Sequence, residues 1–225
     1  MKKIVAVALA ILCALPLVAA DGMKKVSKAN AGKKIAVVSM AANNYGGKLQ
    51  GWNEANSSDL MKTRMNKMLL LLEQNLSSDW TVVNAETFVA KEAYQSLAGE
   101  DREVGVPEYK GARMRLFGKD RKDLVKAKVS AETIKKLAEV AGADYVLVVY
   151  SEWSVAIGKM VPTSKALAKN VVALYDKDGK LVFTGRKDQM GTTTLGAYGK
   201  VVVNDETIDE WVGAFNEGVK FLLTN

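Results

Sequence analysis

Residues 130–155 read SAETIKKLAEVAGADYVLVVYSEWSV, and this stretch decides the fold. Ser130 is a typical N-cap, and Val129 and Ile134 have the spacing of a hydrophobic staple across the first helical turn. Gly142 follows the last apolar position, where helices commonly end in a left-handed residue. Residues 144–155 are wholly apolar at first and then alternate, which predicts a long strand in mid-sheet.

The sequence before this stretch predicts a parallel crossover unit. Residues 34–40 (KIAVVSM) form an apolar run typical of a strand covered on both faces. Residues 59–76 place methionines and leucines on one helical face, which favours core filling over a metal role for these methionines. Residues 80–84 (WTVVN) predict a second strand. We expect a Gly- and Asn-rich loop at 43–58 and a further helix at 87–97.

The sequence after the long strand predicts an antiparallel hairpin and a closing helix. Strands at 165–175 and 180–187 are joined by DKDG at 176–179, and an amphipathic helix covers 206–223. The fold class is α/β: a mixed five-stranded sheet, parallel at the start, with three to four packed helices. We expect residues 21–33 to be a flexible lead-in and residues 34–225 to be a single domain.

Residues 1–20 have the parts of a secretory signal peptide. Lysines at positions 2 and 3 precede an apolar stretch at 4–17 and the small residues VAA at 18–20. The apolar stretch is shorter than the roughly 20 residues that a transmembrane helix needs. We therefore expect cleavage near Ala20 and a periplasmic or secreted mature chain without a transmembrane segment.

Composition excludes several kinds of catalytic site. The 225-residue chain has no histidine, and its single cysteine, Cys13, lies in the leader. This excludes cysteine nucleophiles, Ser-His-Asp triads and His or Cys zinc sites in the mature chain, and we predict neither cofactor nor metal. Bulky Leu12 before Cys13 disfavours lipid attachment there. Without the leader, 30 basic residues face 25 acidic ones, a mild excess of +5.

Two short motifs superficially suggest ligands. Asp176 to Gly179 has the start of a calcium loop but lacks the later ligands and the closing glutamate, so we interpret it as a hairpin turn. Gly46, Gly47 and Lys48 lack the spacing and the hydroxyl residue of a phosphate loop. Neither motif predicts a site.

Residues 137–155 and the turn at 176–179 together resemble a group of bacterial envelope proteins. The group includes the periplasmic domain of the curli secretion channel, the outer-membrane activators of penicillin-binding proteins and the N-terminal domain of the Tol-Pal translocation protein. The resemblance covers most of residues 34–223. It implies a non-enzymatic binding or assembly component, often lipid-anchored, and brings no catalytic residues; the weak lipid-attachment sequence here departs from the group.

Candidate ligand-binding residues follow from the expected sheet, because ligands favour the carboxyl ends of parallel strands. The loops and strand ends there carry Tyr45, Trp52, Glu86, Glu152 and Trp153. Two tryptophans and two carboxylates suit a glycan or a peptide. The alternative is that Trp52 and Trp153 are half-buried packing residues.

The stretch 110–128 (KGARMRLFGKDRKDLVKAK) is a second candidate because it has eight basic residues. We expect it to contact anionic lipid, lipopolysaccharide or an acidic partner, with Met114, Leu116 and Phe117 as apolar anchors. The contact residues would be Lys110, Arg113, Arg115, Lys119, Arg121 and Lys122. A solvated basic loop is the alternative.

These features predict an exported, non-catalytic protein that binds a protein partner or a glycan or lipid component of the envelope, and not nucleic acid. The alternative is a carboxylate-dependent glycan hydrolase with Glu86 and Glu152 as its pair. That alternative requires carboxyl groups about 5–5.5 Å apart for retention or about 6.5–9.5 Å apart for inversion.

Overall fold

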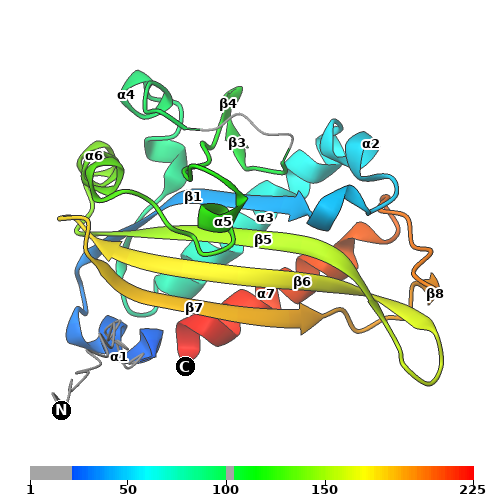
Figure 1. Cartoon of the computed structure of the whole chain (residues 1–225). Coiled ribbons are helices and arrows are strands. Elements are labelled where there is room, and N and C mark those ends of the chain that lie inside the picture. The colour runs from blue at the N-terminus through cyan, green and yellow to red at the C-terminus, as the bar shows by residue number, and fades with distance from the viewer. Residues whose placement is uncertain (1–21, 100–103) are drawn as a thin grey trace, which may run out of the picture.

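The structure is a computed structural model that describes residues 22–99 and 104–225. Its main sheet has the order β2-β1-β5-β6-β7, with the two-residue β8 beside β6 (Figure 1). β2 and β5 pair with β1 in parallel, and β5–β6 and β6–β7 are antiparallel. This confirms the mixed sheet. The strand bounds are β1 Lys34–Asn44, β2 Thr81–Val83, β5 Tyr145–Ile157, β6 Thr163–Asp176, β7 Leu181–Met190 and β8 Gly196–Ala197.

Helices cover the two faces of the sheet unequally. α3 (Asp59–Leu76) and α7 (Ile208–Thr224) lie behind it, with α7 against β6 and β7. α6 (Ala131–Ala141) packs on the other face against β1 and β5, on the same side as the short α5 (Arg121–Leu124). In the described chain, no helix covers this second face at β6 and β7 (Figure 1).

The best-marked segment folds as its sequence predicts. The Ser130 hydroxyl accepts a hydrogen bond from the Thr133 N–H at 3.1 Å, and α6 ends at Gly142 in the left-handed conformation with φ 67°. β5 follows, buried through its first nine residues apart from partly exposed Tyr145. Its partner β1 is buried for the same reason: both strands lie mid-sheet with helices on each side.

The core also confirms the expectation for the helix at 59–76. α3 has these bounds, and the Ser58 hydroxyl caps it by accepting from the Leu60 N–H. Met61, Met65 and Met68 are each at most 1% exposed. These methionines therefore fill the space between α3 and the sheet.

The flexible lead-in expected at 21–33 is corrected by the structure. Residues 23–29 form α1 (Met23–Ala29), which packs against α7. Met23 is 1% exposed, and the Ser27 hydroxyl donates to the Asp79 carboxylate at 3.1 Å. A seven-residue helix is stabilised by such tertiary contacts rather than by its own periodicity, so the sequence pattern did not reveal it.

Two further expectations are wrong in detail. The loop expected at 43–58 contains the end of β1, a 3-10 turn η1 (Tyr45–Gly47) and α2 (Trp52–Asn56). The helix expected at 87–97 is a 3-10 turn η2 (Ala85–Thr87) followed by the single turn α4 (Glu92–Gln95). Apolar side chains there anchor separate turns; Tyr94, for example, is fully buried and donates to the Val38 carbonyl at 2.8 Å.

Residues 104–128 are built from short pieces packed on the helix-covered part of the front face. They comprise the small hairpin β3 (Glu108–Tyr109) and β4 (Ala112–Arg113), and then α5. The predicted signal peptide, its cleavage site and Cys13 lie outside the described residues. Among residues that the structure describes, no helix is both long and apolar enough to cross a membrane.

Candidate functional site

Three side chains that the sequence singled out meet on the open face of the sheet. Tyr45 follows β1, Glu152 lies on β5, and Arg121 is the first residue of α5. Lys169 of β6 and Arg186 of β7 complete the group. These five residues, the sheet-face site, line a shallow hollow of about 180 Å³ together with Val125, Tyr150 and Val171.

Glu152 and Arg121 form the centre of the sheet-face site. Arg121 Nε and Nη2 each donate to one Glu152 carboxylate oxygen at 2.9 Å. Glu152 is only 5% exposed, whereas the Arg121 side chain is 54% exposed. The hydrogen bond to Glu152 raises the pKa of Arg121 above its ordinary value, so the guanidinium keeps its charge. A buried carboxylate thus holds an arginine at a fixed place on the surface.

Two cations lie over the Tyr45 ring. Lys169 Nζ is 3.8 Å from the ring centroid, and Arg121 Cζ is 5.0 Å from it. Cations at these distances are attracted by the negative face of an aromatic ring. Tyr45 remains 38% exposed. It is therefore held in position and still presents an aromatic surface to a ligand.

The charges of the sheet-face site leave one positive charge in excess. Glu152 pairs with Arg121, and Asp188 pairs with Arg186 through two hydrogen bonds of 2.9 and 3.1 Å. Lys169 is directly opposite Glu152 on one side and Asp188 on the other, but its ammonium points to Tyr45 instead. The arrangement suits a carboxylate ligand that approaches Lys169 and the exposed edges of both guanidinium groups.

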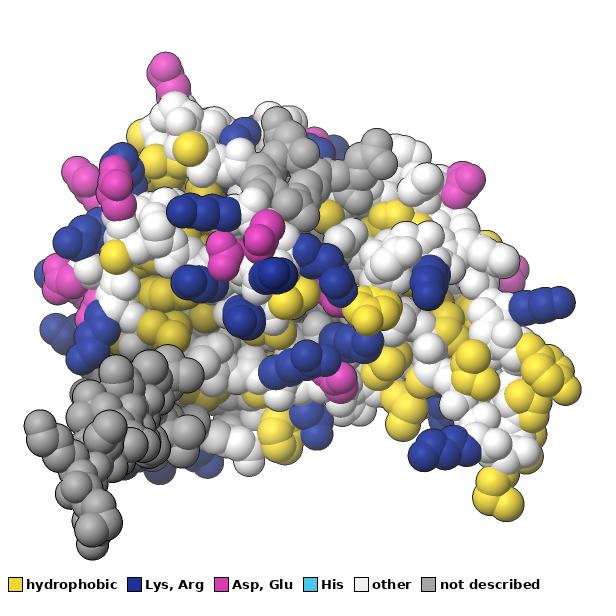
Figure 2. Space-filling view, viewed as in Figure 1, with side chains coloured by type: hydrophobic (Ala, Val, Ile, Leu, Met, Phe, Trp, Pro, Cys, Tyr) yellow, Lys and Arg dark blue, Asp and Glu magenta, His cyan; other side chains and the backbone are white. Residues whose placement is uncertain are grey.

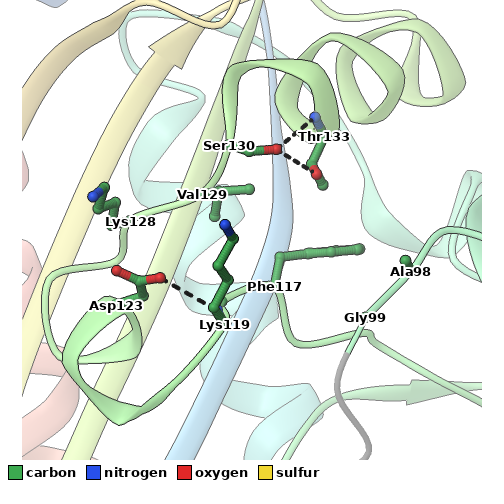
Figure 3. A pocket seen from close by; sticks show the side chains of 10 residues that line it. Ala98, Gly99, Phe117, Lys119, Asp123, Lys128, Val129, Ser130 and Thr133 are labelled. Carbon is green, nitrogen blue, oxygen red and sulfur yellow. Dashed lines mark hydrogen bonds between the residues drawn. The ribbon is translucent and has the colours of Figure 1, made fainter.

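A larger cavity of about 490 Å³ lies on the other side of α5, near the start of α6 (Figure 3). Its polar groups serve the fold: Ser130 caps α6, and the Asp123 carboxylate accepts from the Lys119 N–H at 3.4 Å. Lys119 and Lys128 add positive charge to its wall. We rank this cavity second because it brings together no aromatic platform and no cation fixed by a carboxylate.

The two predicted tryptophans belong to the core. Trp52 is 3% exposed and Trp153 is fully buried, with their ring centroids 5.8 Å apart. Trp153 also stacks on Trp211 of α7 at 6.2 Å. Their rings support the fold beneath the site, in line with the packing alternative, and are not available to a ligand there.

Glu86 and Glu152 lie far apart along the sheet. β2 pairs with β1 up to Val83 opposite Ala36, and η2 with Glu86 follows, whereas Glu152 pairs with Asn43. The seven residues from Ala36 to Asn43 along β1 span about 23 Å. The three residues from Val83 to Glu86 can shorten this distance by at most about 10 Å, even if fully extended. With β2 and β5 on opposite sides of β1, the two Cα atoms are separated by roughly 16 Å or more. Both oxygens of Glu152 are moreover engaged by Arg121, so the structure does not present the two glutamates as the facing pair that glycan hydrolysis requires.

The basic stretch at 110–128 is divided by the structure. Lys119, Arg121 and Lys122 are exposed on and beside α5, and Lys110 is exposed in the β3–β4 turn. Arg113 is also exposed but donates to the Val104 carbonyl, and the partly buried Arg115 donates to the Gly99 carbonyl. The expected apolar anchors were wrong: Met114, Leu116 and Phe117 are 2–3% exposed, because this stretch packs onto the sheet.

Lys169 and Arg186 were missed as site residues because the register of the hairpin shifts where the sequence gives no signal. Tyr175 pairs with Leu181 beside the turn, but Leu174 pairs with Phe183, so β7 gains one residue there. This shift places Val171 opposite Arg186 and Lys169 opposite Asp188, on the face of Glu152. Counting back from the turn alone would have placed Arg186 opposite Asn170, on the other face of the sheet.

Comparison with known proteins gives only remote similarities. No protein-family model matches the chain, and no curated protein matches its sequence. Similar solved structures include the LpoB C-terminal domain from Salmonella enterica, at 16% identity and a TM-score of 0.33 over 74% of this chain and 94% of that one. The hypothetical protein CT253 from Chlamydia trachomatis is similar at 13% identity and a TM-score of 0.38, over 86% of this chain and 92% of that one. Lipoprotein GNA1162 from Neisseria meningitidis is similar at 13% identity and a TM-score of 0.36, over 81% of this chain and 94% of that one.

Proposed function

We propose that this chain is an exported, non-catalytic protein of the cell envelope that binds an acidic segment of a partner protein at the sheet-face site. The observation that carries the proposal is that Lys169 and Arg121 both lie over the Tyr45 ring, with Glu152 holding the arginine in place. Aromatic residues and arginine are the side chains most enriched at protein interfaces.

The shape of the site favours a macromolecular segment over a small molecule. The hollow of about 180 Å³ is smaller than the roughly 300–1,000 Å³ of typical small-molecule pockets. It opens onto a face of β6 and β7 where Thr184, Arg186, Asp188 and Met190 are all exposed. A flat surface with a small central depression suits an extended segment that places one acidic side chain in the hollow.

The chemistry of the site supports binding rather than catalysis. Its one buried carboxylate, Glu152, has both oxygens engaged by Arg121, which leaves it poorly placed as a nucleophile or proton acceptor. The absence of histidine from the sequence removes the commonest general base. The proposal therefore involves no cofactor and no bond-breaking step. Export is part of the proposal and rests on the leader sequence.

In-cell photocrosslinking tests the proposal most directly. A photoreactive phenylalanine analogue at position 45 should capture one envelope protein as a discrete adduct. Lys169→Glu should reduce the adduct at least about tenfold, because it repels the proposed acidic segment. Lys220→Glu is the matched control, since Lys220 is exposed on α7 behind the sheet. No adduct at position 45, or equal loss in both variants, would refute the proposal.

A further inference from the structure

The β5–β6 hairpin extends beyond both of its neighbouring strands. β1 ends opposite Trp153 and β7 ends opposite Leu167, but the β5–β6 ladder continues to Ile157 paired with Ser164. Residues 154–166 thus project from the sheet as a two-stranded ribbon that turns at 158–162 (Figure 1). This ribbon is separate from the sheet-face site.

The end of the ribbon is unusually apolar for an exposed surface. Met160 is 97% exposed, Tyr198 75%, Val161 65% and Ile157 53%. These are four of the ten large hydrophobic side chains that are exposed in the described chain. Figure 2 shows hydrophobic side chains gathered at this end of the molecule. A cluster of this kind marks an interaction surface more often than scattered single residues do.

The apolar end is held in shape by a second segment. β8 pairs with Thr163 and Ser164, the Tyr198 N–H donates to the Pro162 carbonyl at 2.8 Å, and the Gly199 N–H donates to the Ser164 hydroxyl at 2.8 Å. These bonds brace a ribbon that would be marginally stable alone. The exposed side chains are therefore presented on a fixed platform.

The two segments that form this platform carry charge of one sign. Residues 154–175 and 189–204 contain no aspartate or glutamate, while Lys159 and Lys200 are exposed beside the apolar side chains. Lys165 lies further back and donates to the Thr192 carbonyl at 2.7 Å. Exposed apolar groups mixed with lysine and free of carboxylates complement a surface that is both apolar and anionic.

We propose that this hairpin tip (Ile157, Met160, Val161 and Tyr198, with Lys159 and Lys200) inserts shallowly into the surface of an anionic phospholipid membrane. The three aliphatic side chains enter the boundary between headgroups and acyl chains, where apolar burial is favourable. Tyr198 lies at headgroup level, where its ring and hydroxyl are both accommodated. The lysine stems extend so that their ammonium groups meet lipid phosphates.

Charge makes a second copy of the chain the weaker occupant. A two-fold contact between two tips would place Lys159 and Lys200 of each copy near the same lysines of the other, with no carboxylate on either tip segment to compensate. Like charges brought together oppose association. Phospholipid headgroups supply the missing negative charge, so the membrane is the occupant to which the chemistry points.

Vesicle flotation tests the proposal on the protein as recovered from the producing cells. Binding to vesicles of 3:1 phosphatidylethanolamine and phosphatidylglycerol should exceed binding to phosphatidylcholine vesicles at least about tenfold. Met160→Glu should reduce it at least about tenfold, and Lys159→Gln by about fivefold, the effect of one lysine at such a surface. Leu70→Glu is the matched control, because Leu70 is 52% exposed on α3.

Depth of insertion provides a second measurement that does not depend on loss of binding. The four native tryptophans are at most 5% exposed, so Met160→Trp adds a reporter at the tip. Brominated lipid in anionic vesicles should quench this tryptophan, and should leave Leu70→Trp at the native level. Equal quenching of both reporters, or none at position 160, would overturn the proposal.

Three outcomes of these measurements would also overturn the proposal. The native chain could bind neutral and anionic vesicles equally, or Met160→Glu could bind as well as the native chain. The native chain could also fail to bind vesicles and form a dimer that Met160→Glu dissociates. The last outcome would assign the tip to contact between copies of the chain.

Discussion

The sheet-face site and the hairpin tip are both basic and partly aromatic, but they differ in whether carboxylates accompany their basic side chains. At the sheet-face site, Arg121 and Arg186 each have a bidentate carboxylate partner. At the tip, the surrounding segments 154–175 and 189–204 contain no carboxylate at all. The first surface is fixed by its own ion pairs, and the second is left with uncompensated charge.

This difference implies that the sheet-face site selects a particular ligand, whereas the tip attracts anionic surfaces in general. Guanidinium groups fixed by carboxylates, beside an aromatic ring that two cations contact, favour one ligand geometry. Exposed lysines on flexible stems impose little geometry and suit a surface with many equivalent phosphates. Mutations at the sheet-face site should therefore change stability together with binding, whereas mutations at the tip should change binding alone.

The largest effect is expected at the residue that supports both surfaces. Trp211 stacks on Trp153 next to Glu152, and its indole N–H donates to the Ser154 carbonyl at 2.8 Å, where the hairpin leaves the sheet. Trp211→Ala should lower the free energy of unfolding by about 3–5 kcal/mol in urea titration. Phe221→Ala on the same helix, 48% exposed, should lower it by less than about 1 kcal/mol. Similar losses in the two would contradict this role.

A smaller loss of stability is expected from the central ion pair. Arg121→Ala leaves the Glu152 carboxylate 5% exposed without its cation. We expect a loss of about 1 kcal/mol, because the arginine is half exposed and water partly replaces it. Adding Glu152→Gln to Arg121→Ala should restore part of the loss. Lys136→Ala, which removes an exposed pair with Glu132, should change stability by less than about 0.5 kcal/mol.

Glu73 gives a further contrast, because this buried carboxylate has no cation partner among the residues that the structure describes. It is 6% exposed and accepts the Ala85 N–H at 2.7 Å, and burial raises its pKa above 4.5. A raised carboxyl pKa means that the folded state binds more protons, so stability falls as pH rises between the unfolded and folded pKa values. Glu73→Gln should be more stable than the native chain at pH 7, with the advantage vanishing below about pH 4.5. An advantage that persists at pH 3 would contradict this account.

The smallest effect on stability is expected at the tip. Met160 is 97% exposed, so Met160→Glu should change the free energy of unfolding by less than about 0.5 kcal/mol in the same titration. A larger loss would show that the tip packs against the body of the protein. Vesicle binding should nevertheless fall as described above.

The sequence predicted elements whose signals are local. Ser130, Gly142 and the turn at 176–179 each mark a boundary through their own backbone or side-chain chemistry, and the structure confirms all three. α1 and the turns between residues 85 and 95 depend on contacts with distant segments, such as Ser27 with Asp79 and Tyr94 with Val38. Such contacts leave no periodicity to read.

The site was predicted in part for the same reason. Tyr45 and Glu152 were singled out in one hypothesis and Arg121 in another, and only the packing of α5 on β5 unites the two. For Trp52 and Trp153 the structure agrees with the packing alternative and not with the ligand-binding one. The sequence could not decide between them, because a tryptophan beside a strand end has the same pattern whether or not a helix covers it. In the structure they contact each other, and α7 covers Trp153 through Trp211.

One experiment with two readouts tests the independence of the two surfaces. It compares crosslinking yield at position 45 and flotation on anionic vesicles in the native chain, Lys169→Glu, Met160→Glu and the double variant. Lys169 lies five residues from Ser164, about 17 Å along the strand and beyond a Debye length of about 8 Å. We therefore predict that Lys169→Glu loses the adduct and floats within about twofold of the native chain, that Met160→Glu does the reverse, and that the double variant loses both. Loss of both properties in either single variant would contradict the account.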